Sequence, residues 1–174
     1  MNLPKIILVA ICFFWVVACG NDPNKPSSQS QPKLREPLIN ANKARLKMED
    51  LKINKYAERQ NWDMEVTGTG LRYMVYEKGD GPQPTSGQTA IINYEVSLMD
   101  GTVCYSSDTE GTRGFEIGKA ELEKGLDEGI LLLRVGDKSK FILPSHLAHG
   151  LAGDGQKIPS HAVLIYDVTL IDIK

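Results

Sequence analysis

QTAIINYEVSL, residues 88–98, carries the clearest structural pattern of this chain. Apolar and polar side chains alternate along it, and one face holds Ala90, Ile92, Tyr94, Val96 and Leu98. A period of two is typical of a half-buried antiparallel strand. We therefore expect this face to lie in the core of the domain.

Four more segments show a strand pattern. They are Leu71–Glu77, a short segment around Phe115 and Ile117, Lys138–Leu143, and Ala162–Ile173. The last strand has one wholly apolar face, formed by Leu164, Tyr166, Val168 and Leu170. Its opposite face mixes Val163, Ile165 and Ile171 with Asp167 and Thr169.

A single helix is expected among these strands, around Leu122–Leu133. Its apolar side chains form one stripe, made of Leu122, Leu126, Ile130 and Leu133. Two glycines, Gly125 and Gly129, each destabilise it by roughly 1 kcal/mol relative to alanine, so it should be short. These elements predict an α+β fold over residues 61–174, in which an antiparallel half-barrel sheet curls around one short helix.

Ahead of this domain we expect an N-terminal helix over residues 39–60. Its apolar residues stand among charges with imperfect spacing, which indicates a helix that packs on a neighbour or on a second chain. Residues 19–38 are rich in Asn, Pro, Ser, Gln and Lys. Such a composition buries too little apolar surface to fold, so this segment should be a disordered tether.

The first residues predict export. Lys5 precedes an apolar run, 6–18, that is too short to span a bilayer and is typical of a signal peptide. Ala18 before Cys19 resembles the lipobox of bacterial lipoproteins, in which the cysteine is acylated and becomes the mature N-terminus. The alternative is an ordinary secretory signal with an incidental cysteine. Gly20 is not the aspartate that retains some lipoproteins at the inner membrane, which favours the outer membrane of the cell envelope.

Composition excludes several classes of function. The net charge is −2, and removal of Lys5 with residues 1–18 makes it more negative, which argues against nucleic acid as a partner. Cys104 alone would remain as a free thiol, so no intramolecular disulfide is expected. His146 and His149 stand in a segment with Pro144 and Gly150 and without a carboxylate cluster, so we expect no metal site. Residues 151–157 are expected to form a flap.

Nine short motifs occur in order after residue 86. They are Gly87-Gln88-Thr89, Asn93-Tyr94, Asp100-Gly101-Thr102, Phe115-Glu116-Ile117-Gly118, Gly125-Leu126-Asp127-Glu128-Gly129, Val135-Gly136-Asp137-Lys138, Ala148-His149-Gly150, Ile158-Pro159 and Tyr166-Asp167-Val168. Together they resemble the FKBP-type peptidyl-prolyl cis-trans isomerases over residues 70–174. The lipobox and the N-terminal helix further resemble the gliding-motility-associated lipoproteins of that family.

This resemblance implies catalysis without a nucleophile, metal or cofactor. Amide resonance sets a barrier of about 18–20 kcal/mol to rotation of a peptide bond. The twisted transition state has less charge separation than the planar amide, so an apolar and dehydrated pocket favours it. Peptidyl-proline bonds are the substrates because their cis form costs only about 0.5–1 kcal/mol and exchanges slowly without a catalyst.

The resemblance also assigns residues to the site. The proline pocket would be formed by Tyr94, Phe115, Leu122, Leu126, Ile158 and Tyr166, with Tyr94 and Tyr166 among the catalytic residues. The backbone amide of Glu123 would donate to the substrate carbonyl, so its side chain should matter little. His149 stands where the family has a tyrosine that donates to the same carbonyl. Taken alone, the alternation and the helix stripe explain Tyr94, Tyr166 and Leu122 as core residues.

Two positions depart from the family pattern. Tyr105 stands where the family has an aspartate that contacts the substrate, and Leu126 replaces the usual tryptophan at the pocket floor. These departures leave open a proline-binding chaperone or adaptor with little catalysis. A structural envelope lipoprotein is a third reading. Relatives with an N-terminal helix sometimes dimerise through it, and residues 39–60 are too irregular to decide between monomer and dimer.

Overall fold

The structure is a computed structural model that describes residues 32–119 and 122–174. The predicted signal peptide, the acylation site Cys19 and the tether up to residue 31 lie outside the described residues. The chain forms two units, residues 1–39 and residues 40–174. Within the described residues, the first unit contributes only the start of a helix.

The N-terminal helix α1 extends over Pro32–Gln60. It therefore begins before residue 39, and residues 32–38 are helical rather than part of a tether as we predicted. Proline is favoured at the first helical position, and residues 33–36 (KLRE) are all strong helix formers. We assigned this segment to the tether because of its polar composition, although its residues favour a helix. No helix in the described part of the chain is long and apolar enough to cross a membrane.

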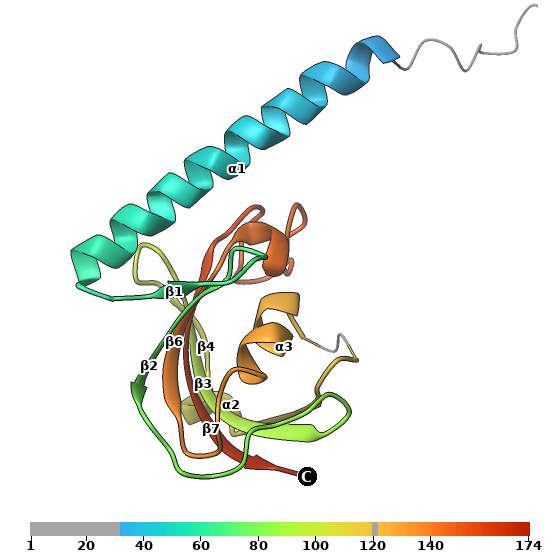
Figure 1. Cartoon of the computed structure of the whole chain (residues 1–174). Helices are drawn as coiled ribbons and strands as arrows, with labels where there is room; N and C mark the ends of the chain where they lie inside the picture. The colour runs from blue at the N-terminus through green and yellow to red at the C-terminus, as the bar shows by residue number, and fades with distance from the viewer. Residues whose placement is uncertain (1–31, 120–121) are drawn as a thin grey trace, which may run out of the picture. The chain divides into compact units, whose positions relative to one another are not determined.

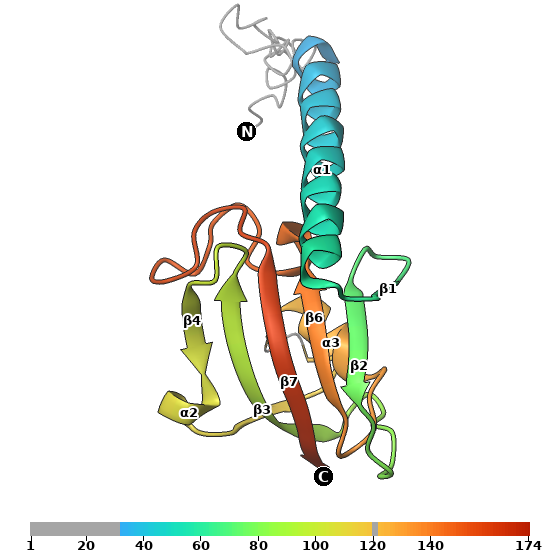
Figure 2. The same cartoon turned by 90° about the vertical axis from the view of Figure 1, so that its left-hand side faces the viewer.

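The second unit is built on one antiparallel sheet in the order β1-β2-β6-β7-β3-β4, with β5 paired to β3. Figure 2 views this sheet face on. The strands are β1 (Glu65–Val66), β2 (Arg72–Glu77), β3 (Thr89–Leu98), β4 (Val103–Ser106), β5 (Arg113–Glu116), β6 (Lys138–Leu143) and β7 (Leu164–Ile173). The central β3 pairs with β7 along its whole length, from Ala90 opposite Ile173 to Leu98 opposite Leu164.

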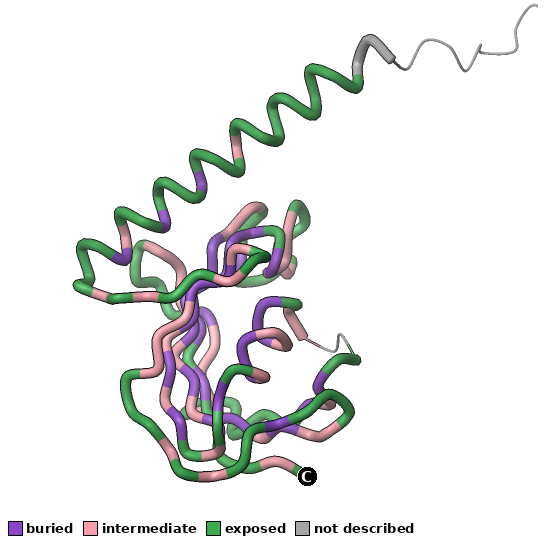
Figure 3. The backbone as a smooth tube through the Cα atoms, in the orientation of Figure 1, coloured by how far each residue is buried: buried purple, intermediate pink, exposed green. Residues whose placement is uncertain are grey.

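Helix α3 (Lys124–Ile130) lies on one side of the curved sheet (Figure 1). Alternate residues of β3 are buried on that side, from Ala90 to Val96, as the period of two predicted. Leu126 and Ile130 meet them from the helix in one apolar cluster. Figure 3 shows buried residues on the inner strands and on α3. The predicted α+β half-barrel around one short helix is confirmed.

Two glycines explain how α3 can lie so close to the sheet. A Cβ on Gly125 would stand 2.6 Å from the side chain of Leu143, and one on Gly129 would stand 2.9 Å from the ring of Phe141. The sequence showed these glycines only as a weakness of the helix. In the structure they permit its close approach to β6.

Residues 53–57 of α1 pack on part of the opposite side of the sheet. Ile53 and Ala57 pack on Ile142, Val163 and Ile165 in a second apolar cluster. This contact explains why the second face of the last strand carries valine and isoleucine. The neighbour expected for the N-terminal helix is therefore the sheet of its own domain.

Polar contacts fasten the same helix to the start of the segment between β6 and β7. The Glu49 carboxylate accepts hydrogen bonds from the backbone N–H of Ser145 at 2.7 Å and from its hydroxyl at 2.8 Å. Arg45 lies 2.6 Å from Nδ1 of His161, at the other end of this segment. Nearby, buried Arg72 contacts Asp50 and Asn54 of the helix.

Four short elements were not predicted from the sequence. They are β1, β4, the helix α2 (Ser107–Glu110) and the 3-10 turn η1 (Ser145–Leu147). Each has four residues or fewer, which is too short for a periodic pattern to show. The ends of α2 depend on local capping, since the Ser106 side chain accepts from the N–H of Asp108.

Candidate functional site

The residues assigned to the pocket gather in one place. Tyr94 from β3, Phe115 from β5 and Tyr166 from β7 belong to the cluster beneath α3, with Leu126 of the helix and Ile158 of the β6–β7 segment. Leu122 and Tyr105 are partly buried against the same cluster. The convergence is a fact of the fold, whereas the binding role of these side chains stays a prediction.

The register of the sheet produces this convergence. Ala90 lies opposite Phe115, Tyr94 opposite Val168, and Val96 opposite Tyr166. Directly opposite residues on antiparallel strands share a face, and so do residues two apart on one strand. Three strands that are distant in sequence thereby place their aromatic rings on the concave side.

Glu123 plays a larger part than we expected. It is the N-cap residue of α3, and its carboxylate Oε1 lies 2.8 Å from Nε2 of His149. The glutamate side chain is only 9% exposed, and Oε2 accepts no hydrogen bond of ordinary geometry from the described residues. The role of its backbone N–H in binding substrate stays a prediction, and in the free protein its side chain also contacts His149.

The two pocket tyrosines remain protonated. Burial, together with the charge of the Glu123 carboxylate, raises the pKa of Tyr166 well above its ordinary value. The hydroxyl of Tyr94 donates to Oε2 of Glu110 at 2.8 Å. Burial and this hydrogen bond raise the pKa of Tyr94 as well. Both phenols are therefore neutral hydrogen-bond donors at physiological pH.

Tyr105 ties the predicted flap to β4. Its hydroxyl donates to the carboxylate of Asp154, whose other oxygen accepts the N–H groups of Gln156 and Ile158 at 2.8 Å each. The hydrogen bond to Asp154 raises the pKa of Tyr105 to about 12. Partial desolvation opposes ionisation of Asp154, but these three hydrogen bonds prevail and lower its pKa to about 2.

The Tyr105–Asp154 contact gives the departure from the family pattern a structural meaning. Position 105 has no carboxylate, but the Tyr105 hydroxyl binds one that comes from position 154 of the flap. Beside it Lys157 lies 4.7 Å from the centre of the Tyr105 ring. Cys104 is buried as predicted, and burial raises the pKa of its thiol.

Arg113 is a residue that our sequence reasoning missed. It lies on β5 opposite Ile92 and two positions before Phe115, so it shares the concave face with both. Its guanidinium is close enough to Tyr94 to oppose the rise in that tyrosine's pKa. The spacing of two from Phe115 was the available signal, but the strand looked too short to assign its start.

Comparison with known proteins identifies the family of this chain. Residues 81–171 match the sequence profile of the FKBP-type peptidyl-prolyl cis-trans isomerases, which covers more than half of the chain. The chain belongs to this family.

Individual relatives support the assignment. The probable FKBP-type isomerase FkpA of Neisseria meningitidis serogroup B is 36% identical over 110 residues, which are 63% of this chain and 40% of that protein. FK506-binding protein 1 of Dictyostelium discoideum is 32% identical over 106 residues, 60% of this chain and 99% of that protein. The crystal structure of FkpA from Escherichia coli aligns with a TM-score of 0.64 at 30% identity, over 84% of this chain and 75% of that one. The match thus spans about 40% of the FkpA sequence from N. meningitidis.

Two further findings concern the described residues 32–119 and 122–174. No group of three or more His, Cys, Asp or Glu side chains gathers there in a way that could hold a metal ion. A shallow hollow lined by Lys52, Lys55, Glu58, Arg59, Met99 and Asp100 lies apart from the pocket residues.

Proposed function

We propose that this chain is a peptidyl-prolyl cis-trans isomerase that acts on X-Pro bonds of exported or envelope proteins. The observation that carries the proposal is the convergence of Tyr94, Phe115, Leu126, Ile158 and Tyr166 in one apolar cluster between the sheet and α3. Family membership supports the same activity. No cofactor takes part, because rotation about a peptide bond makes and breaks no covalent bond.

In this proposal the pocket acts by matching the twisted amide. The proline ring enters the apolar cluster and loses its water, which favours the less polar transition state. The backbone N–H of Glu123 and the imidazole of His149 donate to the substrate carbonyl. In the free protein Nε2 of His149 lies 2.8 Å from the Glu123 carboxylate, so this N–H is shared with the substrate carbonyl or passes to it when substrate binds.

The location of the activity is part of the proposal. Acylation of Cys19 after removal of residues 1–18 would anchor the chain to a membrane of the cell envelope, and the outer membrane is favoured by Gly20. The clients would be proline-containing proteins that fold in the periplasm or in gliding machinery. Leu46, Met48 and Leu51 of α1 are 40–56% exposed, which supports a dimer through this helix.

A second candidate is a proline-binding chaperone or adaptor with little catalysis. The observation in its favour is the tie between Tyr105 and Asp154, which holds the flap against β4. A flap that opens slowly would let the pocket retain a proline segment rather than turn it over.

The test is a proline-limited refolding assay with the full chain. Ala substitutions at the buried tyrosines would disturb the core, so the informative variants are Tyr94→Phe and Tyr166→Phe. They keep the rings but remove the hydroxyls beside the Glu110 and Glu123 carboxylates, which makes the pocket less favourable for the less polar transition state. The matched control is Tyr76→Phe, since Tyr76 donates its hydroxyl to Asp167 away from the pocket cluster. We expect acceleration of refolding, a loss in the two pocket variants and none in the control. Suppressed aggregation without acceleration would replace the enzyme with the chaperone.

A further inference from the structure

We propose that Arg113 makes this pocket select proline segments that carry an acidic residue next to the proline, above all Glu-Pro and Asp-Pro. The inference rests on the proposed isomerase function and adds a substrate class to it. It follows from where Arg113 lies and from how the other charges around the pocket are already engaged.

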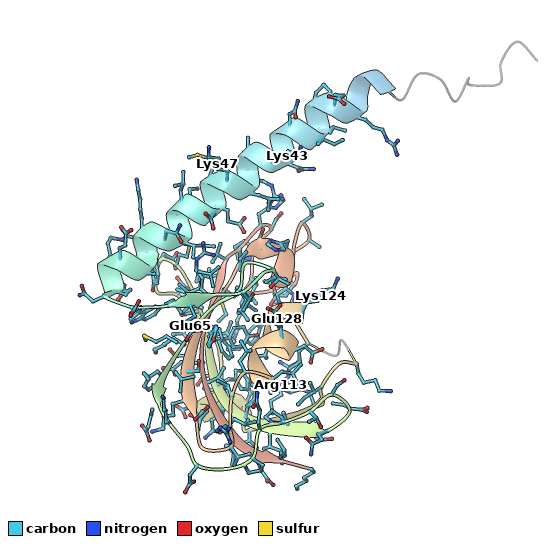
Figure 4. All side chains as sticks on the ribbon, viewed as in Figure 1. Lys43, Lys47, Glu65, Arg113, Lys124 and Glu128 are labelled. Atoms are coloured by element: carbon cyan, nitrogen blue, oxygen red, sulfur yellow. The ribbon has the colours of Figure 1, made fainter. Side chains whose placement is uncertain are left out.

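The position of Arg113 follows from strand register. Arg113 pairs with Ile92 and Phe115 pairs with Ala90, so both β5 side chains stand on the face that carries Tyr94. Phe115 is buried in the cluster, whereas Arg113 is exposed. Figure 4 shows Arg113 on the same side of the sheet as α3. Arg113 therefore stands at the solvent margin of the pocket, where the residues that flank a bound proline must leave it.

The carboxylates around the pocket already have partners. Glu110 accepts from Tyr94, Glu123 pairs with His149, and Asp154 accepts from Tyr105 and two backbone N–H groups. Lys157 donates to the backbone carbonyl of Cys104 at 2.7 Å.

Arg113, by contrast, forms no ion pair with any described carboxylate within 4 Å, although the chain as a whole is acidic. In the cluster it lies within reach of the neutral phenol of Tyr94, whose pKa it lowers. A guanidinium presents a planar fork of N–H donors that matches a carboxylate with two hydrogen bonds. The nearby carboxylates keep their negative charge but have their oxygens engaged by other donors, whereas the guanidinium of Arg113 has no carboxylate partner among the described residues and can pair with one on a substrate.

The size of the effect follows from the exposure of Arg113. An ion pair at a solvent-exposed margin changes an equilibrium by up to about fivefold, and salt weakens it. A lysine at the same substrate position would be repelled to a comparable degree. We therefore expect kcat/KM at low ionic strength to fall in the order Glu-Pro, Gln-Pro, Lys-Pro, with at most about fivefold between neighbours in this order.

The experiment measures this order with short peptides that differ only in the residue before proline. The full chain is compared with Arg113→Gln, which should remove the preference, and with Arg113→Glu, which should reverse it. The control is Lys78→Glu, which changes the net charge equally at an exposed position after β2. It should leave the order intact, and added salt should compress the order in the wild type.

The two proposals fail in different ways. Equal kcat/KM values for the three peptides in the wild type, or an order that Arg113→Glu does not change, would overturn the role of Arg113 and leave the isomerase standing. If no peptide is isomerised, the proposed function fails. The affinities of the same peptides, measured by calorimetry, then decide the role of Arg113: the same charge order with its reversal supports it, and equal affinities refute it.

Discussion

Glu49 offers the sharpest test of how the N-terminal helix supports the pocket. Its side chain is buried in the contact between α1 and the domain, and both of its oxygens bind Ser145. Ser145 is 1% exposed and opens the segment that carries His149 and Ile158. The carbonyl of Ser145 accepts the N–H of Gly150, whose own carbonyl accepts the N–H of His161.

The magnitude can be worked from these contacts. A hydrogen bond to a charged group contributes about 1.5–3 kcal/mol, and a buried donor left without a partner costs about 1–3 kcal/mol. Glu49→Ala removes both bonds to Ser145, while the Ser145 hydroxyl keeps a weak contact with Arg45 at 3.4 Å. We therefore expect a loss of about 2–4 kcal/mol in the free energy of unfolding. Glu49→Gln keeps an acceptor and should lose about half as much.

Urea unfolding of the full chain measures this loss, and amide hydrogen exchange shows where it acts. Residues 145–161 should exchange faster in Glu49→Ala, and kcat/KM should fall with them because His149 loses its fixed position. Glu58→Ala, an exposed change on the same helix, is the control. If Glu49→Ala loses no more stability than this control, the contact does not position the segment and our reasoning is wrong.

Three further outcomes are expected. In Tyr105→Phe the pKa of Asp154 should rise from about 2 toward its ordinary value, because one donor is lost. The stability that the wild type gains from this lowered pKa is present above about pH 4 and is lost as the pH falls toward 2. The free energy of unfolding of the variant should therefore depend less on pH between about 4 and 2. Carboxyl NMR titration measures the pKa, and unfolding at each pH measures the stability. Gly129→Ala should lower the free energy of unfolding by about 1–3 kcal/mol despite the better helix propensity, because its Cβ would stand 2.9 Å from the facing phenylalanine ring. The control Gly68→Ala, with nothing within 4 Å of its Cβ, should change the free energy of unfolding by under about 0.5 kcal/mol. Equal melting temperatures for the two variants would contradict this prediction. Ile53→Ala should lower the free energy of unfolding by about 2–5 kcal/mol, because it leaves a cavity between α1 and the sheet. If it lowers this free energy no more than an exposed leucine-to-alanine change on the same helix, the helix is not packed on the sheet at this position.

Much of the candidate site could be named in advance, but for two different reasons. The burial of Tyr94 and Tyr166 follows from alternation within single strands. Their meeting with Phe115 and Ile158 came from the family resemblance, since no local pattern joins segments so far apart. Neither alternation nor the family resemblance predicted the flap contact between Tyr105 and Asp154, which connects residues 49 positions apart.

What the sequence alone determined is the longer strands, the short helix α3 and the face that each buries, because these depend on periodicities of two and 3.6 residues within short windows. Only the tertiary structure decided that α1 covers Val163 and Ile165, that Glu123 holds His149, and that Arg113 stands at the pocket margin. These contacts join residues from different elements, and their energy depends on distance and burial rather than on position along the chain. The sequence does not show whether a charged side chain binds water or a buried group, because this depends on which residues the fold places beside it.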